Sequence, residues 1–286
     1  MNAPRTVSLF SHTRTEDTAG PLKRVLELAR DAGVEVHLSP REALKHGFAA
    51  SADGVTLVDE DGDGADLALV LGGDGTILAA LRHYAGRRVP VFAVNFGAIG
   101  FLATVEPSEL EDGVRRAFAG EFDVMELPAL VATTDEGERL AVNDISFHRR
   151  QDGRVAELAY SVSGEELGEV RCDGLVVSTP AGSTGYNLAN GGPVLAWGVE
   201  GFVVSFIAPH TLTARALVVA PGDVLEVTNR SRAEEVDMTT DGRAVCALAP
   251  QATVPICFAE GRSLLAQAPG ATFYHRLRDK FGRLSY

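Results

Sequence analysis

The stretch from Ala65 to Tyr84, ADLALVLGGDGTILAALRHY, constrains the fold of this chain more than any other. Leu67 to Leu71 form a short, continuous apolar run, which predicts a strand that is buried on both faces. The apolar residues after the turn recur at helical spacing and predict a helix. A strand, a turn and a helix in this order favour an α/β domain. The turn itself consists of Gly72, Gly73, Asp74 and Gly75.

Asp74 is the unusual residue of this turn. Glycine N–H groups and the N-terminus of the following helix favour an anion such as phosphate, which repels a carboxylate. Asp74 therefore has two interpretations. In the first it acts on a phosphate-bearing ligand, by holding a metal or by accepting a proton from a hydroxyl. In the second it is only the N-cap of the helix.

The charge balance limits the partners of this chain. Its 286 residues, enough for one large domain or two ordinary ones, include 26 basic and 39 acidic side chains, which give a net charge of −13. This charge argues against nucleic acid or an anionic membrane as the main partner. We see no signal peptide or membrane span, and the three cysteines (172, 246 and 257) indicate reduced thiols, so we expect a cytoplasmic protein.

Strands and helices alternate in the first part of the sequence, which predicts a doubly wound parallel sheet. In such sheets ligands bind beyond the carboxyl ends of the strands, where Asp74 and Asn95 fall. The strands are expected at Thr6 to Phe10, Val34 to Leu38, Asp66 to Leu71 and Val89 to Val94, and two of the helices at Pro21 to Ala32 and Pro107 to Phe118.

From about Glu126 the pattern changes to short β-like runs separated by turn residues, which predicts a β-rich second domain. Helical spacing returns in the basic tail at Phe273 to Phe281. We therefore expect an α/β domain at 1–126 together with the tail at 269–286, and a β-rich domain at 127–268. The expected strands of the second domain include Leu140 to His148 and Ala252 to Phe258.

Four further stretches contain small and polar residues where a plain core is apolar. Each one alone also fits a glycine turn or an edge loop. No G-x-G-x-x-G follows a strand, so an ordinary dinucleotide-binding fold is not supported. The stretches are Asn95 to Phe101 (NFGAIGF), Val142 to Phe147 (VNDISF), Cys172 to Ala189 (CDGLVVSTPAGSTGYNLA) and Asp241 to Arg243 (DGR).

Together with GGDGT and the later APHTLTARALVV, these motifs resemble in order and spacing the NAD kinases of bacterial type. The resemblance runs from about Val70 to the C-terminal tail. GGDGT is shared with diacylglycerol and sphingosine kinases and with 6-phosphofructokinase, so it identifies only the superfamily. The long segment of serine, threonine and glycine is more specific.

The resemblance implies an enzyme that transfers a phosphoryl group from ATP, or from polyphosphate in some members, to the 2′-hydroxyl of the adenosine ribose of NAD, making NADP. It implies magnesium held mainly by the donor phosphates, with no metal site built from protein residues. It also implies a homodimer or homotetramer, in which a neighbour completes the nicotinamide pocket, and a tail that returns to the first domain.

The resemblance further implies roles for individual residues. Asp74 is expected to accept the proton of the 2′-hydroxyl, Asn143 and Asp144 to hold the ribose, and Asp173 to bind the substrate by hydrogen bonds. Tyr186 is expected to stack on adenine. The other expected nucleotide or substrate contacts are Gly72, Gly73, Gly75, Asn95, Phe96, Arg154, Ser183, Thr184, Gly185, Asn187, Ala189, Ala208, His210 and Arg243.

Two positions depart from the pattern of the resembled family. Asp144 stands where members often carry Glu, and Ala79 stands where they often carry Arg. The second departure removes a cation expected near the substrate phosphates. The residues that we consider as replacements are Arg82, His148, Arg149 and Arg154.

Two other functions stay open at this point. A lipid kinase shares the GGDGT motif, but the chain lacks an exposed basic or amphipathic membrane face and carries the STPAGSTGY segment. A non-catalytic NAD(P)-binding sensor would also keep the binding motifs, although it has no need of Asp74.

Overall fold

A computed structural model describes residues 2–48, 54–59, 64–97, 100–103, 105–150 and 154–282. The chain divides into unit 1, Met1–Glu126 with Ser263–Tyr286, and unit 2, Leu127–Arg262. The predicted combination of an α/β part, a β-rich part and a tail helix is confirmed. Within the described ranges, no helix is long and apolar enough to cross a membrane.

Unit 1 is built on a parallel sheet with the strand order β17-β5-β4-β1-β2-β3. The order reverses between β1 and β4, and ligands of such sheets bind beyond the carboxyl ends of the strands at that point. Asp74 follows the end of β4 closely. The strands are β1 (Thr6–Ser11), β2 (Glu35–Leu38), β3 (Val55–Leu57), β4 (Leu67–Gly72), β5 (Pro90–Asn95) and the second half of β17 (Thr253–Gln267).

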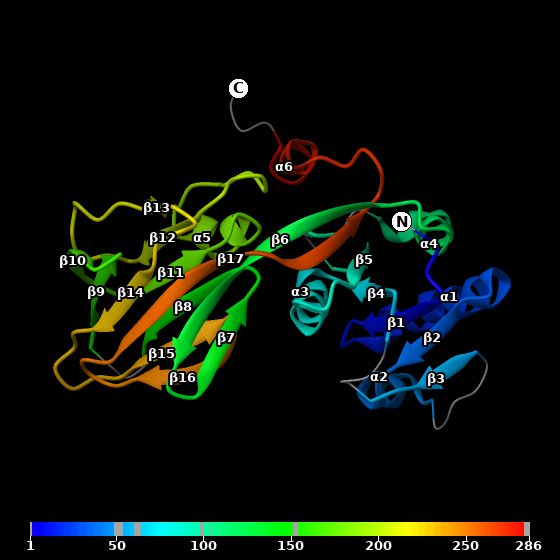
Figure 1. The fold of residues 1–286 in the computed structure, drawn as a ribbon, viewed down its shortest axis with the longest axis horizontal. Helices are drawn as coiled ribbons and strands as arrows, with labels where there is room; N and C mark the ends of the chain where they lie inside the picture. The colour runs from blue at the N-terminus through cyan, green and yellow to red at the C-terminus, as the bar shows by residue number, and fades with distance from the viewer. Residues whose placement is uncertain are drawn as a thin grey trace. The chain divides into compact units, whose positions relative to one another are not determined.

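Helices cover both faces of this sheet because its strands are apolar on both sides (Figure 1). Leu67, Leu69 and Leu71 share one core with α1 and α4. On the opposite face Tyr84, directly after α3, packs edge-on against Phe10 of β1, with ring centroids 6.0 Å apart. The helices of unit 1 are α1 (Ala19–Ala32), α2 (Pro40–His46), α3 (Asp74–His83), α4 (Leu110–Ala119) and α6 (Phe273–Phe281), with 3-10 turns η1 (Thr15–Asp17) and η2 (Pro107–Glu109).

Unit 2 consists mainly of antiparallel strands around a second core. One sheet has the order β13-β12-β11-β8-β15-β16, and the other contains β10, β9, β14 and the first half of β17. The strands are β6 (Asp123–Thr134), β7 (Gly137–Ala141), β8 (Asp144–Arg149), β9 (Ala156–Val162), β10 (Glu165–Cys172), β11 (Gly174–Ser178), β12 (Phe202–Ile207), β13 (Leu217–Val219), β14 (Leu225–Asn229), β15 (Val236–Thr240) and β16 (Arg243–Leu248). The short helices are η3 (Gly182–Thr184) and α5 (Tyr186–Ala189).

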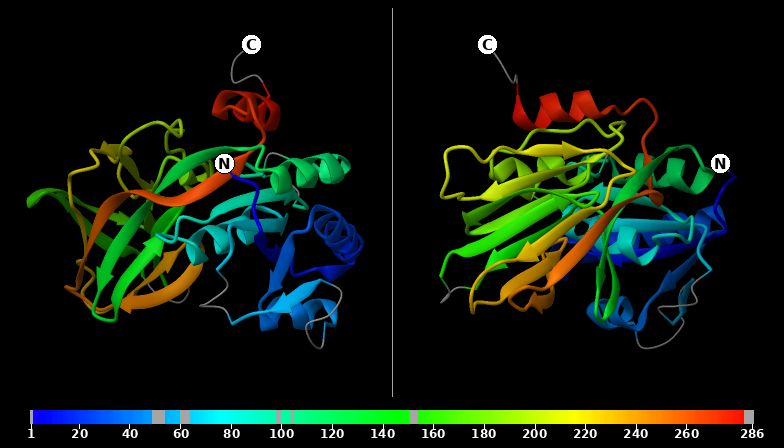
Figure 2. Two further views of the ribbon diagram at one scale, coloured as in Figure 1. Left: turned by 45° about the vertical axis from the view of Figure 1, so that its right-hand side comes forward. Right: turned by 60° about the vertical axis from the view of Figure 1, so that its left-hand side comes forward.

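The long strand β17 differs most from the expectation. The sequence predicts a strand that ends at Phe258, but β17 continues to Gln267, as the orange strand in Figure 2 shows. Its second half pairs in parallel with β5, from Leu264 to Ala266. The tail therefore joins unit 1 at Ser263 rather than at residue 269.

Candidate functional site

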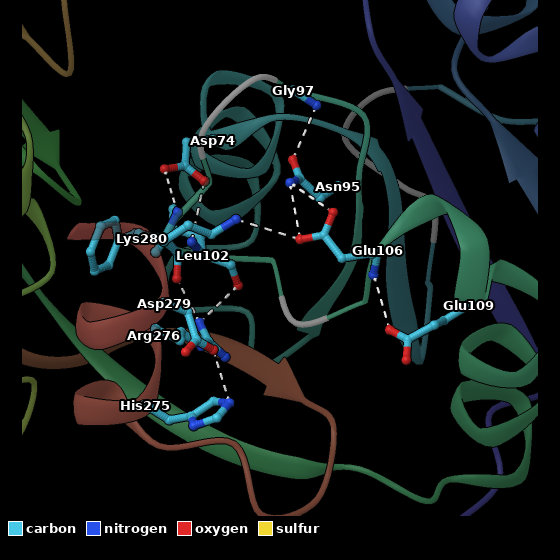
Figure 3. A network of polar contacts seen from close by, with 11 residues as sticks. Asp74, Asn95, Gly97, Leu102, Glu106, Glu109, His275, Arg276, Asp279 and Lys280 are labelled. Atoms are coloured by element: carbon cyan, nitrogen blue, oxygen red, sulfur yellow. Dashed lines mark hydrogen bonds and ion pairs between the residues drawn. The ribbon is translucent and has the colours of Figure 1, made fainter. Parts of the chain in front are cut away.

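The carboxylate of Asp74 does not cap the helix that it begins. Gly73 is the N-cap of α3 and Asp74 is its first residue, with no hydrogen bond from a capping side chain. Instead the two carboxylate oxygens accept main-chain N–H groups from another loop, Oδ2 from Phe101 at 2.9 Å and Oδ1 from Leu102 at 3.2 Å (Figure 3). The interpretation of Asp74 as an N-cap is therefore wrong, and its side chain is held in one orientation.

The environment of Asp74 acts on its pKa in both directions. Burial raises the pKa of this carboxyl above its ordinary value. The N–H groups of Phe101 and Leu102 and the positive charges of Lys280 and Arg276 oppose this rise in the pKa. Partial burial with fixed donors is the arrangement expected of a carboxylate that accepts a proton.

Asn95, at the end of β5, lies at the same edge of the sheet as Asp74 and holds the turn that follows β5. Its Oδ1 accepts the N–H of Gly97 at 3.0 Å, and its Nδ2 lies 3.4 Å from each carboxylate oxygen of Glu106. The two glycine turns touch, since a Cβ on Gly97 would lie 2.8 Å from the Cα of Gly73. Only glycine permits this approach of one turn to the other. Phe96 donates its N–H to the carbonyl of Gly72 at 3.2 Å, and residues 98 and 99 lie outside the described ranges.

In unit 2 the Asn143–Asp144 segment is fixed by Asp241, which belongs to the last of the four polar stretches noted in the sequence. Asp241 Oδ1 accepts the N–H of Asn143 at 2.7 Å and that of Asp144 at 3.1 Å, and Oδ2 accepts the N–H of Val142 at 3.1 Å. Burial, and next the negative charge of Asp241, raise the pKa of Asp144 to about 7. Among the described residues, the buried Asn143 Oδ1 has no hydrogen-bond partner.

The serine- and threonine-rich segment folds as a loop anchored on Asn143. The N–H of Thr179 and the hydroxyl of Ser178 both donate to the Asn143 carbonyl, at 2.9 and 3.2 Å. A Cβ on Gly182 would lie 2.1 Å from the same carbonyl oxygen. Ser183 and Asn187 are fully buried and bond main-chain groups of their own loop, so in this structure their side chains hold the loop.

Tyr186 is the aromatic residue that the structure leaves accessible beside this loop, with 37% of its surface exposed. Its ring stacks on His148, with centroids 5.6 Å apart and an interplanar angle of 18°. Burial raises the pKa of Tyr186, and the nearby negative charges of Asp144 and Asp173 add to this rise. The tyrosine therefore lies close to both predicted ribose and substrate acids.

Asp173 is paired with Arg149. Its Oδ1 accepts a hydrogen bond from Arg149 Nε at 2.6 Å, and its main-chain carbonyl accepts the Arg149 N–H at 3.0 Å. Arg149, which sequence analysis considered as a phosphate cation, is thus paired with another predicted site residue. His148, the second such residue, bonds Ser146 Oγ through Nε2 at 2.8 Å.

The remaining predicted contacts lie farther out. Arg154 is largely exposed, with its Nε 3.9 Å from Glu234. Arg82 is eight residues after Asp74 in α3, about 12 Å along the helix axis at 1.5 Å per residue. Gly75 is the second residue of α3, next to Asp74, while Thr184, Gly185 and Ala189 flank Tyr186. Ala208, His210 and Arg243 are exposed on unit 2.

Arg276 and Lys280 lie outside every predicted motif. Arg276, in the tail helix α6, donates from Nη1 to the carbonyl of Phe101 at 2.6 Å, and Lys280 Nζ lies 3.5 Å from Glu106 Oε1 (Figure 3). Both charges act on the pKa of Asp74. Their spacing of four residues, which places them on one face of a helix, is the signal in the sequence that indicates a common target.

Comparison with known proteins finds matches to both the first and the second part of the chain. Residues 15–122 match the family model for the ATP-NAD kinase N-terminal domain, and residues 142–267 match that for the C-terminal domain. An NAD kinase of Gemmatimonas aurantiaca is 40% identical over 225 residues, covering 76% of this chain and 77% of the relative. An NAD kinase of Citrifermentans bemidjiense is 36% identical and covers 87% of each chain.

Solved structures show the same fold. An NAD kinase from Archaeoglobus fulgidus in complex with ATP has a TM-score of 0.75 at 27% identity and covers 97% of each chain. Yeast NADH kinase complexed with NADH has a TM-score of 0.87 at 20% identity, covering all of this chain and 91% of the other.

Proposed function

Since this chain belongs to the ATP-NAD kinase family, we propose that Asp74 is the group that orients the 2′-hydroxyl of the adenosine ribose of NAD and accepts its proton as phosphate is transferred from ATP. The observation that carries this proposal is the carboxylate of Asp74, which is held by two N–H groups outside its own helix and has a raised pKa. A capping role does not explain this geometry.

The proton is taken late in the reaction. A ribose hydroxyl is a very weak acid, and even a carboxylate with a raised pKa is too weak a base to remove its proton beforehand. Phosphoryl transfer has a loose transition state in which positioning and charge neutralisation dominate. The N–H groups of Phe101 and Leu102 provide the positioning, because they fix both oxygens of Asp74.

Residues of unit 2 hold the adenosine in this proposal. Asn143 Oδ1 is buried without a partner among the described residues, and a buried polar atom in that state loses about 1–3 kcal/mol unless a ligand satisfies it. A ribose hydroxyl would do so. Asp144 and Asp173 supply further acceptors, and the exposed part of Tyr186 offers a stacking surface for adenine.

We expect magnesium to reach the site on the phosphates of ATP. Both oxygens of Asp74 already accept N–H groups, which fits a metal that takes most of its ligands from the donor. Bound in this way, magnesium supplies charge neutralisation. Polyphosphate as a second donor and a homodimer or homotetramer as the assembly also belong to the proposal.

The variant Asp74→Asn tests the proposed role. Asn keeps the shape of the side chain and can bond the ribose, but it cannot accept the proton, so we expect turnover to fall about 10²–10⁴-fold. NAD affinity, measured by calorimetry, should be unchanged or slightly higher, because a negative charge near phosphate is lost. NADP formation is followed with a strictly NADP-dependent dehydrogenase, with ATP and with polyphosphate as donors.

Two results would contradict this role. Wild-type turnover of Asp74→Asn would remove Asp74 from the chemistry. Loss of NAD binding by a folded Asp74→Asn protein would make Asp74 a ribose anchor instead. The matched control is Asp66→Asn, because Asp66 also accepts two main-chain N–H groups, from Arg5 and Thr6, but lies at the start of β4 instead of its end.

A further inference from the structure

The tail helix α6 contacts the loop that holds Asp74. Arg276 Nη1 donates to the carbonyl of Phe101 at 2.6 Å and lies 3.4 Å from that of Leu102. The ring of Phe281, at the end of the same helix, packs on the ring of Phe101 with centroids 5.2 Å apart. Helix α6 thus meets the loop through both polar and aromatic contacts.

A single peptide group links Arg276 to Asp74. The carbonyl of Phe101 and the N–H of Leu102 belong to the same peptide unit; the carbonyl accepts from Arg276, and the N–H donates to Asp74 Oδ1 at 3.2 Å. A cation on the carbonyl side polarises this peptide and strengthens the hydrogen bond on its N–H side. Arg276 therefore affects both the position and the charge of Asp74.

Arg276 is a charged side chain in a buried position. Its side chain is almost completely buried, with 7% of the residue exposed. Burial lowers its pKa to about 10, and the negative charge of Asp74 opposes this change. A buried guanidinium is costly unless it is paired. The guanidinium thus remains charged at neutral pH, with Asp74 as an opposite charge close to it.

Lys280 adds a second positive charge from the next turn of α6. Its Nζ lies 3.5 Å from Glu106 Oε1, and the Glu106 carboxylate is also within 3.4 Å of Asn95 Nδ2 (Figure 3). Among the described residues, the charged groups that act on the pKa of Asp74 are Lys280 and Arg276, with Glu106 as the acid beside Lys280. Helix α6 thus contacts Phe101 through Arg276 and Glu106 through Lys280.

We propose that helix α6 is a working part of the phosphoryl-transfer site, in which Arg276 positions the Asp74 carboxylate through the Phe101–Leu102 peptide and Lys280 places a second positive charge beside it. This inference rests on the proposed role of Asp74. Arg276 is a positioning residue, since it acts on the reaction through Asp74. The positive charges of both residues favour the ionised form of Asp74, against the effect of its burial.

The test is the pH profile of kcat/KM, measured in an Asp144→Asn background because the pKa of Asp144 is about 7. In that background the acidic limb reports the protonation of Asp74 in the free enzyme. Removing a cation that lowers the pKa of Asp74 lets that pKa rise, so the acidic limb moves to higher pH. For Lys280→Gln and Arg276→Gln we expect a shift of about one pH unit, at the low end of the effect of a nearby opposite charge.

Arg276→Lys separates charge from position. It keeps the positive charge, so the acidic limb of its pH profile should stay near that of the wild type. It loses the guanidinium geometry, so its plateau rate should be as low as that of Arg276→Gln. The matched control is Arg278→Gln, which removes the same charge from the same helix at an exposed position that pairs with Asp279 and His275. It should leave the profile unchanged.

Each outcome bears on a different claim. If Lys280→Gln and Arg276→Gln give the same limb and plateau as Arg278→Gln, the inference is wrong even when Asp74→Asn is inactive. If Asp74→Asn is itself fully active, the proposed function fails first. Thermal unfolding and NAD binding show which variants fold; if Arg276→Gln does not, the half-exposed Lys280 decides the question of charge.

Discussion

At the scale of single residues, Asp144 gives the clearest pH-dependent prediction. Its pKa of about 7 in the folded protein lies well above the value of about 3.9 expected for an unfolded chain. Between these values the native state holds a proton that the unfolded state lacks, so the free energy of unfolding falls as the pH rises from about 4 to about 7. In Asp144→Asn this fall in the free energy of unfolding is absent, because the amide does not titrate.

The measurement is the melting temperature of wild type and Asp144→Asn at pH 5 and at pH 8. The melting temperature of Asp144→Asn minus that of the wild type should be larger at pH 8 than at pH 5. The control is Glu169→Gln, since Glu169 is an exposed acid on β10. Its melting temperature should differ from that of the wild type by the same amount at pH 5 and at pH 8. An equal effect of Asp144→Asn at both pH values would show that Asp144 titrates normally.

Motif spacing indicates residues that act within short segments, and it fails for those that act across the chain. Asp74, Asn143 and Tyr186 were predicted because each lies within a motif of its own. Arg276 was not, because its target, the Phe101 carbonyl, is far away in sequence and offers only a main-chain atom. The contact of Asp241 with the Asn143 region has the same character.

At the scale of elements, the loop after β11 depends on the absence of a side chain at Gly182. A Cβ there would lie 2.1 Å from the Asn143 carbonyl oxygen, and neither backbone can yield without moving the loop. We expect Gly182→Ala to cost about 1–3 kcal/mol of stability, as overpacking does, and to weaken NAD binding. Thermal unfolding and calorimetry measure the two effects.

Gly198→Ala is the matched control in the same unit. No heavy atom lies within 4 Å of the Cβ that it would add, and its φ is outside the left-handed region. Both measurements should match the wild type. A Gly182→Ala protein with wild-type stability and affinity would show that the loop is not anchored on Asn143.

Elements were predicted where apolar periodicity is unbroken. The alternation of β1 and the continuous apolar run of β4 are of this kind, whereas β17 continues through Glu260, Gly261 and Arg262, which interrupt the apolar pattern. The expected strand at 140–148 is two strands, β7 and β8, because Val142 and Asn143 bond Asp241 between them. Exposed strands such as β10 and β16 carry too few buried residues to form a pattern.

At the scale of the whole molecule, the proposed oligomer requires an interface, and among the described residues of unit 2 the edge strand β13 carries exposed apolar side chains. This strand pairs with β12 on one side and ends the six-stranded sheet on the other. Val218 is 49% exposed on it, and Leu212 in the preceding loop is 92% exposed. An edge strand with exposed apolar side chains is suited to pairing with another chain.

We therefore expect the wild type to sediment as a dimer or a larger assembly at micromolar concentration, and Val218→Lys to shift it towards the monomer, because a lysine places a charge in an apolar contact. Leu167→Lys is the control: Leu167 is 46% exposed on β10, which ends the other sheet, so the same change is made on an edge of similar exposure. A monomeric wild type would contradict the oligomer itself. An oligomer that survives Val218→Lys but is lost in Leu167→Lys would move the interface to β10. If Val218→Lys yields a folded monomer, its NAD kinase turnover then measures how much of the site the neighbouring subunit supplies.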